Sequence, residues 1–290
     1  MIAAAEIHRH AREWGIDPMI VELDYVLGCF LSRWFRHPMA AKMIFKGGTC
    51  LRKCYFPDYR FSEYIDITAQ EPVDAGPFRE AIEVVASDLA QTAGVDLRAQ
   101  PPRIETADAG DGTPYIEARL YVRGPLRRTG WPQAIRIDIS TGEPMAFPAV
   151  KRELDHPYSD SAAIGAEGLR IPCYDLREML LEKLRGLSGQ RRYAIARDLY
   201  DAHRLLDHAQ IAIGDVIPYA RAKFAARGLG ISPGLVASIE ARKDEFMNDW
   251  GRNVDRLIPG ERRGGFDAAW ATTVQALTAL VVPGQGQSEE

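Results

Sequence analysis

The stretch from Phe45 to Thr68 reads FKGGT at its start and RFSEYIDIT at its end, with a helical run between them. A Gly-Gly-Thr turn after a short apolar run predicts a strand that enters a helix. Glycines let the backbone approach an anionic group closely, and the N–H groups of a helix start favour phosphate. In the returning strand, Ile65 and Ile67 are expected on one face, and Tyr64, Asp66 and Thr68 on the other.

The length and composition are those of an ordinary globular protein. With 290 residues, the chain can form one large domain or two modest ones. No apolar run reaches the roughly 18 residues that a membrane helix needs, and no signal sequence opens the chain. We therefore expect a cytoplasmic protein without a membrane partner.

The cysteines and histidines carry no metal-binding pattern in the sequence. The four cysteines have no CxxC spacing, and the six histidines form no HExxH motif. Cys50 and Cys54 are one helical turn apart, and we expect buried, reduced thiols.

The periodicity predicts an α+β chain. Helices are expected at 18–36 and 77–93, and strands at 95–98, 115–122 and 134–140. Residues 108–113 are expected to form a hairpin turn, and 141–170 a long excursion between domains. Asp175 is a candidate N-cap that pairs with Glu178 in a capping box, and further helices are expected at 192–208, 214–228, 233–250 and 264–281.

The net charge of −4 argues weakly against a protein that coats itself in nucleic acid, but it leaves room for a local basic cleft. Arginines that would suit a nucleotide or tRNA phosphate, if they line one cleft, are Arg119, Arg123, Arg127, Arg128, Arg136, Arg185, Arg191, Arg192 and Arg197.

The glycine turn and the acidic strand together resemble the AbiEii/AbiGii toxin family, within the nucleotidyltransferases of polymerase-β type. The family pattern is Lys-Gly-Gly-Thr, a Leu-Arg pair, and Arg-Phe-Ser-Glu-Asp-Ile/Leu-Asp. Lys46–Arg52 and Arg60–Asp66 match it, except that Tyr64 stands where the family has aspartate. The resemblance implies a nucleotidyltransferase domain with a small mixed sheet at 1–170 and a helical domain at 171–282. From its residues, the tail at 283–290 is expected to be disordered.

Nucleotidyl transfer needs carboxylates that hold a divalent metal ion against the triphosphate. Alternate residues of a strand share a face, and in the family this pair would be positions 64 and 66. Asp138, between Ile137 and Ile139, matches the family's third carboxylate. Taken alone, it would be the polar face of a half-buried strand.

Tyr64 breaks the carboxylate pair. A phenol has a pKa of about 10 and is a poor ligand for a hard cation. Glu63 is expected on the opposite face, so Asp66 and Asp138 would remain as metal ligands and would bind Mg²⁺ weakly. The chain is then either a natural pseudoenzyme or a disabled enzyme. We favour the latter, because one base change converts an Asp codon to a Tyr codon and a toxic product selects for such changes.

A second motif lies in the helical part. Lys183 falls on a leucine stripe and matches a family lysine that is thought to act on the phosphates. Asp198 and Asp201 match the family's Arg-Asp-x-x-Asp, and they share a helix face, which is costly unless a cation lies near them. Asp198 is expected either to contact Lys183 or to act as a general base. Arg197 could instead bridge to Asp201 as a structural pair.

The resemblance therefore implies transfer of a nucleotide from NTP, with Mg²⁺, to an RNA acceptor such as the tRNA 3′ end, and a cognate antitoxin as partner. Two alternatives stay open: a small-molecule nucleotidyltransferase of the antibiotic-resistance type, and a non-catalytic protein that binds nucleotide or antitoxin. Expected catalytic positions are Asp66, Lys183, Asp198 and the substituted Tyr64; expected nucleotide contacts are Lys46, Gly47, Gly48, Thr49, Arg52, Ser62, Lys183, Arg197 and Asp201.

Overall fold

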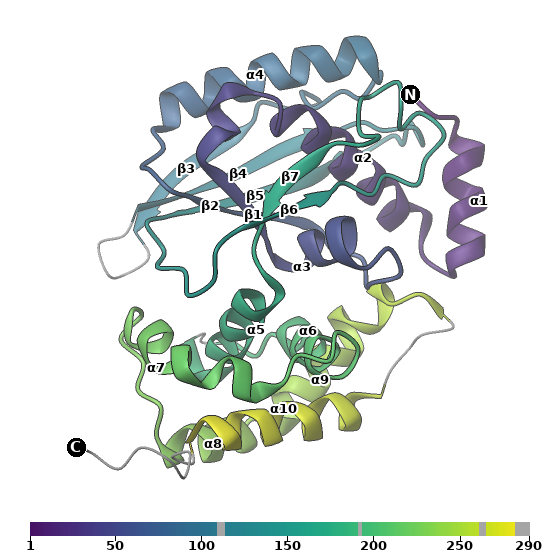
Figure 1. The fold of residues 1–290 in the computed structure, drawn as a ribbon. Helices are drawn as coiled ribbons and strands as arrows, with labels where there is room; N and C mark the ends of the chain where they lie inside the picture. Colours follow the sequence, from purple (N-terminus) through teal and green to yellow (C-terminus); the bar gives the residue numbers. More distant parts are fainter. Residues whose placement is uncertain (109–113, 191–192, 261–264, 282–290) are drawn as a thin grey trace. The chain divides into compact units, whose positions relative to one another are not determined.

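The computed structural model describes residues 1–108, 114–190, 193–260 and 265–281 (Figure 1). The expected hairpin turn at 108–113, Arg191, Arg192 and the tail at 283–290 therefore lie wholly or largely outside the described residues. No helix in the described part of the chain combines the length and apolar character that a membrane span requires.

The chain forms two compact units. The first contains Met1–Glu143, Ala149–Tyr174 and a short segment that begins at Leu257. The second contains Pro144–Pro148, Asp175–Arg256 and the segment that holds the last helix. The sequence predicts a boundary at residue 170, and the first unit extends to Tyr174 but leaves out Pro144–Pro148.

The first unit is built on a mixed seven-stranded sheet in the order β3-β4-β5-β2-β1-β7-β6 (Figure 1). The strands are β1 (Met43–Lys46), β2 (Tyr64–Ala69), β3 (Arg103–Asp108), β4 (Pro114–Val122), β5 (Gln133–Thr141), β6 (Val150–Glu153) and β7 (Arg170–Cys173). β2 runs antiparallel to β1 and parallel to β5, and β1 runs parallel to β7.

Buried and partly exposed residues alternate along the central strands, which gives the sheet an apolar face and a polar face. Ile65 and Ile67 of β2 and Ile137 and Ile139 of β5 are buried. Asp66 and Asp138, between them, keep partial exposure. One face of the sheet is therefore apolar core and the other is polar, as the sequence predicted.

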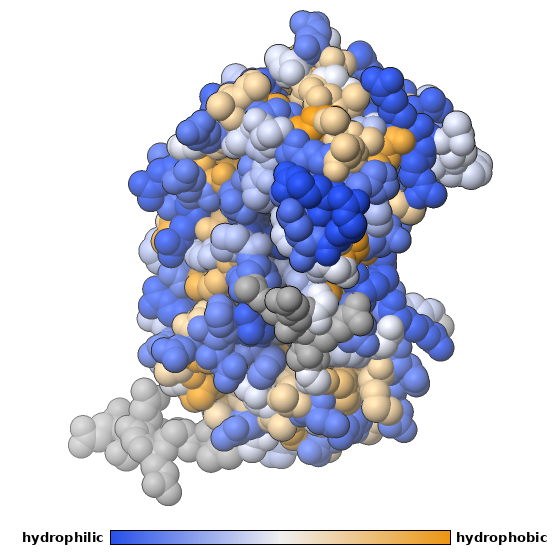
Figure 2. Space-filling model, turned by 90° about the vertical axis from the view of Figure 1, so that its right-hand side faces the viewer, coloured by the Kyte–Doolittle hydropathy of each residue, from blue (hydrophilic) through white to orange (hydrophobic). Residues whose placement is uncertain are grey.

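Helices α2 (Pro18–Trp34) and α4 (Ala75–Thr92) both contact the sheet and each other, and α1 (Ala4–Trp14) packs on α2 (Figure 1). Asp17 caps α2 by accepting a hydrogen bond from the Met19 amide at 2.7 Å, and Pro18 takes the first helical position. Figure 2 views the side on which α1 lies, and hydrophilic residues predominate there. This agrees with an amphipathic α1 that buries Ile7 and Ala11.

Two expectations for the sheet were wrong. Residues 95–98 form only an isolated bridge between Asp96 and Arg123, and the edge strand β3 lies further along the chain. Residues 141–170 are not an excursion between domains, because most of them belong to the first unit and include β6. β6 and β7 have four residues each, too few to show a readable alternation.

The second unit consists of helices. They are α5 (Leu176–Arg185), α6 (Ala196–Asp207), α7 (Ile217–Ala225), α8 (Pro233–Glu240), α9 (Lys243–Asn253) and α10 (Phe266–Val281). The single helix expected at 233–250 is two helices, separated by a turn at Ala241–Arg242. Arg242 donates a hydrogen bond to Glu245 at 2.8 Å, and Glu245 also accepts the Ala194 amide at 2.6 Å. These two contacts hold the Glu245 side chain in place at the start of α9.

The start of α5 differs from the expected capping box. Asp175 caps the helix by accepting the Arg177 amide at 2.9 Å. Glu178 does not reach back to the cap; it accepts the amides of Ala146 and Phe147 at 2.8 and 3.0 Å and forms a buried ion pair with Lys223 at 2.5 Å. These bonds explain why Pro144–Pro148 belongs to the second unit.

A buried carboxylate joins α2 to the segment after the glycine turn. Asp24 accepts from Arg52 Nε at 2.8 Å, from Lys53 Nζ at 2.6 Å and from the Tyr158 hydroxyl at 2.9 Å. The side chains of Asp24 and Lys53 are each 1% exposed. Burial alone would raise the pKa of Asp24, but the guanidinium and ammonium groups hold it well below its usual value.

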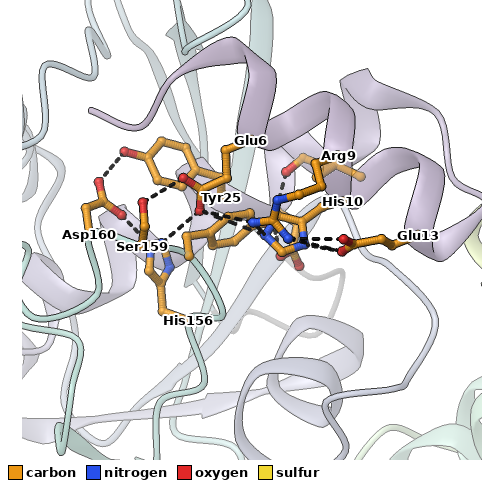
Figure 3. A network of polar contacts seen from close by, with 11 residues as sticks. Glu6, Arg9, His10, Glu13, Tyr25, His156, Ser159 and Asp160 are labelled. Carbon is orange, nitrogen blue, oxygen red and sulfur yellow. Dashed lines mark hydrogen bonds and ion pairs between the residues drawn. The ribbon is translucent and has the colours of Figure 1, made fainter.

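The loop that carries Tyr158 is fixed on both sides of that residue. Figure 3 shows Asp160 between the Tyr25 hydroxyl, which donates to it at 2.7 Å, and His156, whose Nε2 lies at 3.4 Å. Glu6 of α1 accepts both the amide and the hydroxyl of Ser159, at 2.8 and 2.6 Å. Hydrogen bonds therefore hold this loop, α1 and α2 together around Asp24.

Replacing Asp24 by Asn should lower the free energy of unfolding by about 3–5 kcal/mol, because two buried cations lose their counter-charge. Asp88→Asn is the matched control: Asp88 pairs with Arg33 at 3.0 Å, but its side chain is 44% exposed. The control should cost at most about 1 kcal/mol. Chemical denaturation measures both values, and equal effects would contradict a special role for Asp24.

The pH dependence has a defined sign. The pKa of Asp24 is lowered in the folded state, so its contribution is present above the pKa of the unfolded chain, about 3.9, and is lost as the pH falls from there toward the folded value. The stability difference between the wild type and Asp24→Asn should therefore be constant near neutral pH and shrink below about pH 4. A constant difference down to pH 2 would contradict this.

Candidate active site

The glycine turn is filled by the chain's own charged side chains. Gly47, at φ +77°, lies so close to Asp66 that a Cβ would stand 2.1 Å from the carboxylate Oδ2. A Cβ on Gly48 would stand 2.5 Å from the Arg60 guanidinium. The sequence predicted a close approach by an anion, and in the structure the approaching anion is Asp66.

The same turn fixes the segment that leads into β2. The Thr49 hydroxyl donates to the Tyr64 carbonyl, and Arg60 donates to the Phe61 carbonyl at 3.1 Å. The Phe61 amide in turn donates to the Leu257 carbonyl at 2.8 Å. Because Gly47, Gly48 and Thr49 are all buried, the turn serves here to position Asp66 and Arg60.

Strand register places acidic residues in one row across the polar face. Asp66 of β2 is paired with Asp138 of β5, Asp138 with Glu117 of β4, and Glu117 with Glu105 of β3. Neighbouring members of such a row are about 5 Å apart at the backbone. Lys46 of β1 pairs with Asp66 and ends the row with a cation.

The negative charge of the acidic row affects the neighbouring side chain of Tyr115. Tyr115 lies two residues before Glu117 on the same face of β4. Partial burial and the charges of Glu117, Asp138 and Glu105 raise the pKa of Tyr115. Like charges side by side are unfavourable unless a cation joins them, and Mg²⁺ prefers carboxylate oxygens. Asp66, Asp138 and Glu117 therefore supply, from three neighbouring strands, carboxylates of the type that Mg²⁺ prefers, although their oxygens are not gathered within 4.8 Å of one another.

Glu117 was missed by the sequence reasoning. Its signal was the alternation Ile116-Glu117-Ala118, which puts it on a polar face but does not say which residue of β5 it opposes. The register with Asp138 supplies that information.

A basic row lies beside the acidic one. Two positions along the strands from Asp66, Asp138, Glu117 and Glu105, toward the same end of the sheet, the register runs Tyr64, Arg136, Arg119 and Arg103. Arg136 lies 5.1 Å from the Tyr64 ring centre and donates to its hydroxyl. The polar face of the sheet thus presents parallel rows of opposite charge.

Three other predicted contacts are placed as follows. Lys46 forms an ion pair with buried Glu143 at 2.7 Å. Ser62 is 6% exposed. Arg52, expected to bind nucleotide, is buried beside Asp24, where it donates to the Tyr59 carbonyl at 2.7 Å and stacks 3.5 Å from the Phe61 ring centre.

In the second unit, the structure brings the predicted residues of α5 and α6 together. Lys183 Nζ lies 2.7 Å from Asp198 and 2.9 Å from Asp201. The side chain of Asp201 is fully buried, and that of Lys183 is 14% exposed. A Cβ on Gly186 would stand 3.1 Å from Asp198, so this glycine leaves room for the carboxylate. Lys183 is the cation that allows the two aspartates to share a helix face.

The surrounding arginines divide between the two units. Arg119 and Arg136 are exposed on the polar face of the sheet. Arg185 is buried on α5, and Arg197 is partly exposed on α6.

Known structures share this fold. MenT4, a nucleotidyltransferase toxin from Mycobacterium tuberculosis H37Rv, superimposes with a TM-score of 0.57 at 21% identity, over 97% of this chain and 90% of that one. JHP933 from Helicobacter pylori gives 0.55 at 15% identity, over 91% and 93%. A second H. pylori structure, described as a putative nucleotidyltransferase, gives 0.56 at 14% identity, over 91% and 96%.

No curated protein matches the sequence. A family model does: the one described as nucleotidyl transferase AbiEii toxin, type IV TA system, covers residues 29–275. The matched region contains the glycine turn, the acidic row and the Lys183 cluster. The chain belongs to the AbiEii family of nucleotidyltransferase toxins.

Proposed function

We propose that this toxin transfers a nucleotide from an NTP to an RNA acceptor, the tRNA 3′ end being the first candidate, and so blocks translation. The family supplies the reaction class, the nucleotide substrate and an antitoxin as partner. The observation that carries the choice of acceptor is the pair of charged rows on the polar face of the sheet.

The acidic row is the proposed metal-binding part. Asp66 and Asp138 would hold Mg²⁺, with Glu117 as the next carboxylate in the row. A divalent ion bound there supplies charge neutralisation for the triphosphate. The glycine turn keeps Asp66 in place, since any side chain at Gly47 would displace the carboxylate.

The basic row is the proposed acceptor-binding part. Arg103, Arg119 and Arg136 form a strip beside the carboxylates, and such a strip suits the regularly spaced phosphates of RNA. A drug-sized cationic acceptor, as in antibiotic-modifying enzymes, would be repelled by it. This favours RNA over the small-molecule alternative.

The Lys183 cluster is the proposed phosphate-binding part of the second unit. Asp198 and Asp201 fix the position of the Lys183 ammonium group. A lysine held in this way can offset phosphate charge without losing side-chain freedom on binding. Asp198 is also the group that could accept a proton from an attacking hydroxyl.

Tyr64 is the proposed lesion. A phenol stands where the family has a carboxylate, two residues before Asp66, and Arg136 donates a hydrogen bond to it. We propose that the chain as it stands transfers nucleotide slowly or not at all.

Restoring Tyr64 to Asp should raise transfer of labelled nucleotide to total tRNA by at least about tenfold, because the metal ion regains a ligand. Tyr121→Asp is the matched control: it adds the same charge on the same face of the sheet, but on β4 and outside the family position. The measurement is label incorporated with Mg²⁺ and each NTP in turn.

The outcomes separate the alternatives. No transfer in either form, with NTP still bound, would favour the non-catalytic binding protein. Label on a small molecule but not on RNA would favour the antibiotic-type enzyme. A gain with Tyr121→Asp equal to that with Tyr64→Asp would show that added charge, and not the ligand position, is responsible.

In the Tyr64→Asp background, Arg119→Ala should raise the KM for tRNA several-fold and leave the KM for NTP unchanged, because one phosphate contact is lost. Its effect should shrink as salt rises. Arg12→Ala, an exposed arginine of α1, is the control and should change neither value. A rise in the KM for NTP instead would move Arg119 to the nucleotide.

A further inference from the structure

Three cysteines that are far apart in the sequence meet in the first unit. The sulfur atoms of Cys50, Cys54 and Cys173 all lie within 4.8 Å of one another. Cys50 ends α3 (Gly47–Cys50), Cys54 lies in the following π turn, Leu51–Tyr55, and Cys173 ends β7. Among the described residues, no other set of three His, Cys, Asp or Glu side chains gathers its ligand atoms so closely.

The backbone holds the two sides of the cluster in register. The Tyr174 amide donates to the Phe45 carbonyl at 2.9 Å, and Cys173 is paired with Phe45 across β1 and β7. The Tyr55 hydroxyl donates to the Tyr174 carbonyl. The neighbours of Cys54 and Cys173 are thus tied together, so the proximity of the sulfurs is built into the fold.

From this geometry we propose that Cys50, Cys54 and Cys173 form a binding site for a thiophilic metal ion, with Zn²⁺ as the occupant. Three sulfurs around Zn²⁺, at Zn–S distances of about 2.3 Å, are about 3.8 Å apart. The observed separations need to shrink by about 1 Å at most to match that value, which side-chain rotation supplies. Soft thiolate ligands select Zn²⁺ and Cu⁺ over Mg²⁺, so this site is chemically distinct from the acidic row.

A cationic side chain lies next to the cluster. The Arg152 guanidinium, 4.7 Å from the Tyr55 ring centre, lies on this side of the sheet and can offset the net negative charge of three thiolates around a divalent ion.

An ion can reach the cluster from outside. Cys50 and Cys173 are fully buried, but Cys54 is partly exposed and lines a cavity of about 300 Å³. Asp155 and His156 line the same cavity. Three sulfurs leave the fourth position of Zn²⁺ open, and the cavity provides space for a water there.

A disulfide would use only two of the three sulfurs and leave the third unpaired, whereas a metal ion uses all of them. A bound ion would link α3 to β7 and so stiffen the glycine turn that precedes Cys50. Binding to the folded state alone would also raise the melting temperature.

The test uses the reduced, metal-free full-length chain and Cd²⁺ as a spectroscopic probe. One equivalent of Cd²⁺ should give an ultraviolet sulfur-to-metal charge-transfer band with the intensity of three Cd–S bonds. Cys54→Ser should reduce the band by about a third and weaken binding at least about 100-fold. Cys29→Ser is the matched control, since Cys29 is a buried thiol in α2 outside the cluster, and it should keep the full band.

Zn²⁺ binding is measured by competition with a chromogenic chelator and by the melting temperature. Zn²⁺ should raise the melting temperature of the wild type and of Cys29→Ser, but not of Cys54→Ser. Circular dichroism checks that each metal-free variant is folded, and the substitution at partly exposed Cys54 disturbs the core least. No band in the wild type, or the same band after Cys54→Ser, would overturn the proposal, as would a disulfide within the cluster that persists under reducing conditions.

Discussion

The structure depends on the buried ion cluster in which Asp24 holds Arg52 and Lys53. These two cations directly follow the helix start at the glycine turn, and their counter-charge comes from α2. A buried charge is tolerated only when it is paired and hydrogen-bonded, so the contact admits a single arrangement of the two segments. Gly47 leaves room for Asp66, and Thr49 donates a hydrogen bond to the Tyr64 carbonyl. The contact of Asp24 with Arg52 and Lys53 therefore also determines where Asp66, and with it the acidic row, lies.

The glycine turn has a structural role that its sequence alone does not reveal. Two glycines before a helix start predicted close approach to a phosphate. The space above Gly47 is taken by Asp66 and that above Gly48 by Arg60. The motif therefore fixes a carboxylate and a guanidinium, and in the proposed reaction it acts through those side chains.

Much of the fold could be predicted because alternation assigns a face to each strand residue. Asp66 and Asp138 were placed correctly on the polar face of the sheet. The helices expected at 18–36 and 77–93 correspond to α2 and α4. Alternation does not give register, so the pairing of Glu117 with Asp138 could not be predicted. Nor could Cys173 be assigned to Cys50, because β7 is four residues long and its pairing with β1 spans more than a hundred residues of sequence.

The strand order has a consequence for synthesis on the ribosome. β1 is made early and pairs with β2 soon after, but its other edge pairs with β7, which begins only at Arg170. Until then the nascent chain carries an apolar edge, Met43–Phe45, with unpaired backbone groups, the kind of edge on which chains aggregate. β7 therefore covers this edge late. The growing chain most needs protection from neighbouring chains between the synthesis of residue 46 and that of residue 173.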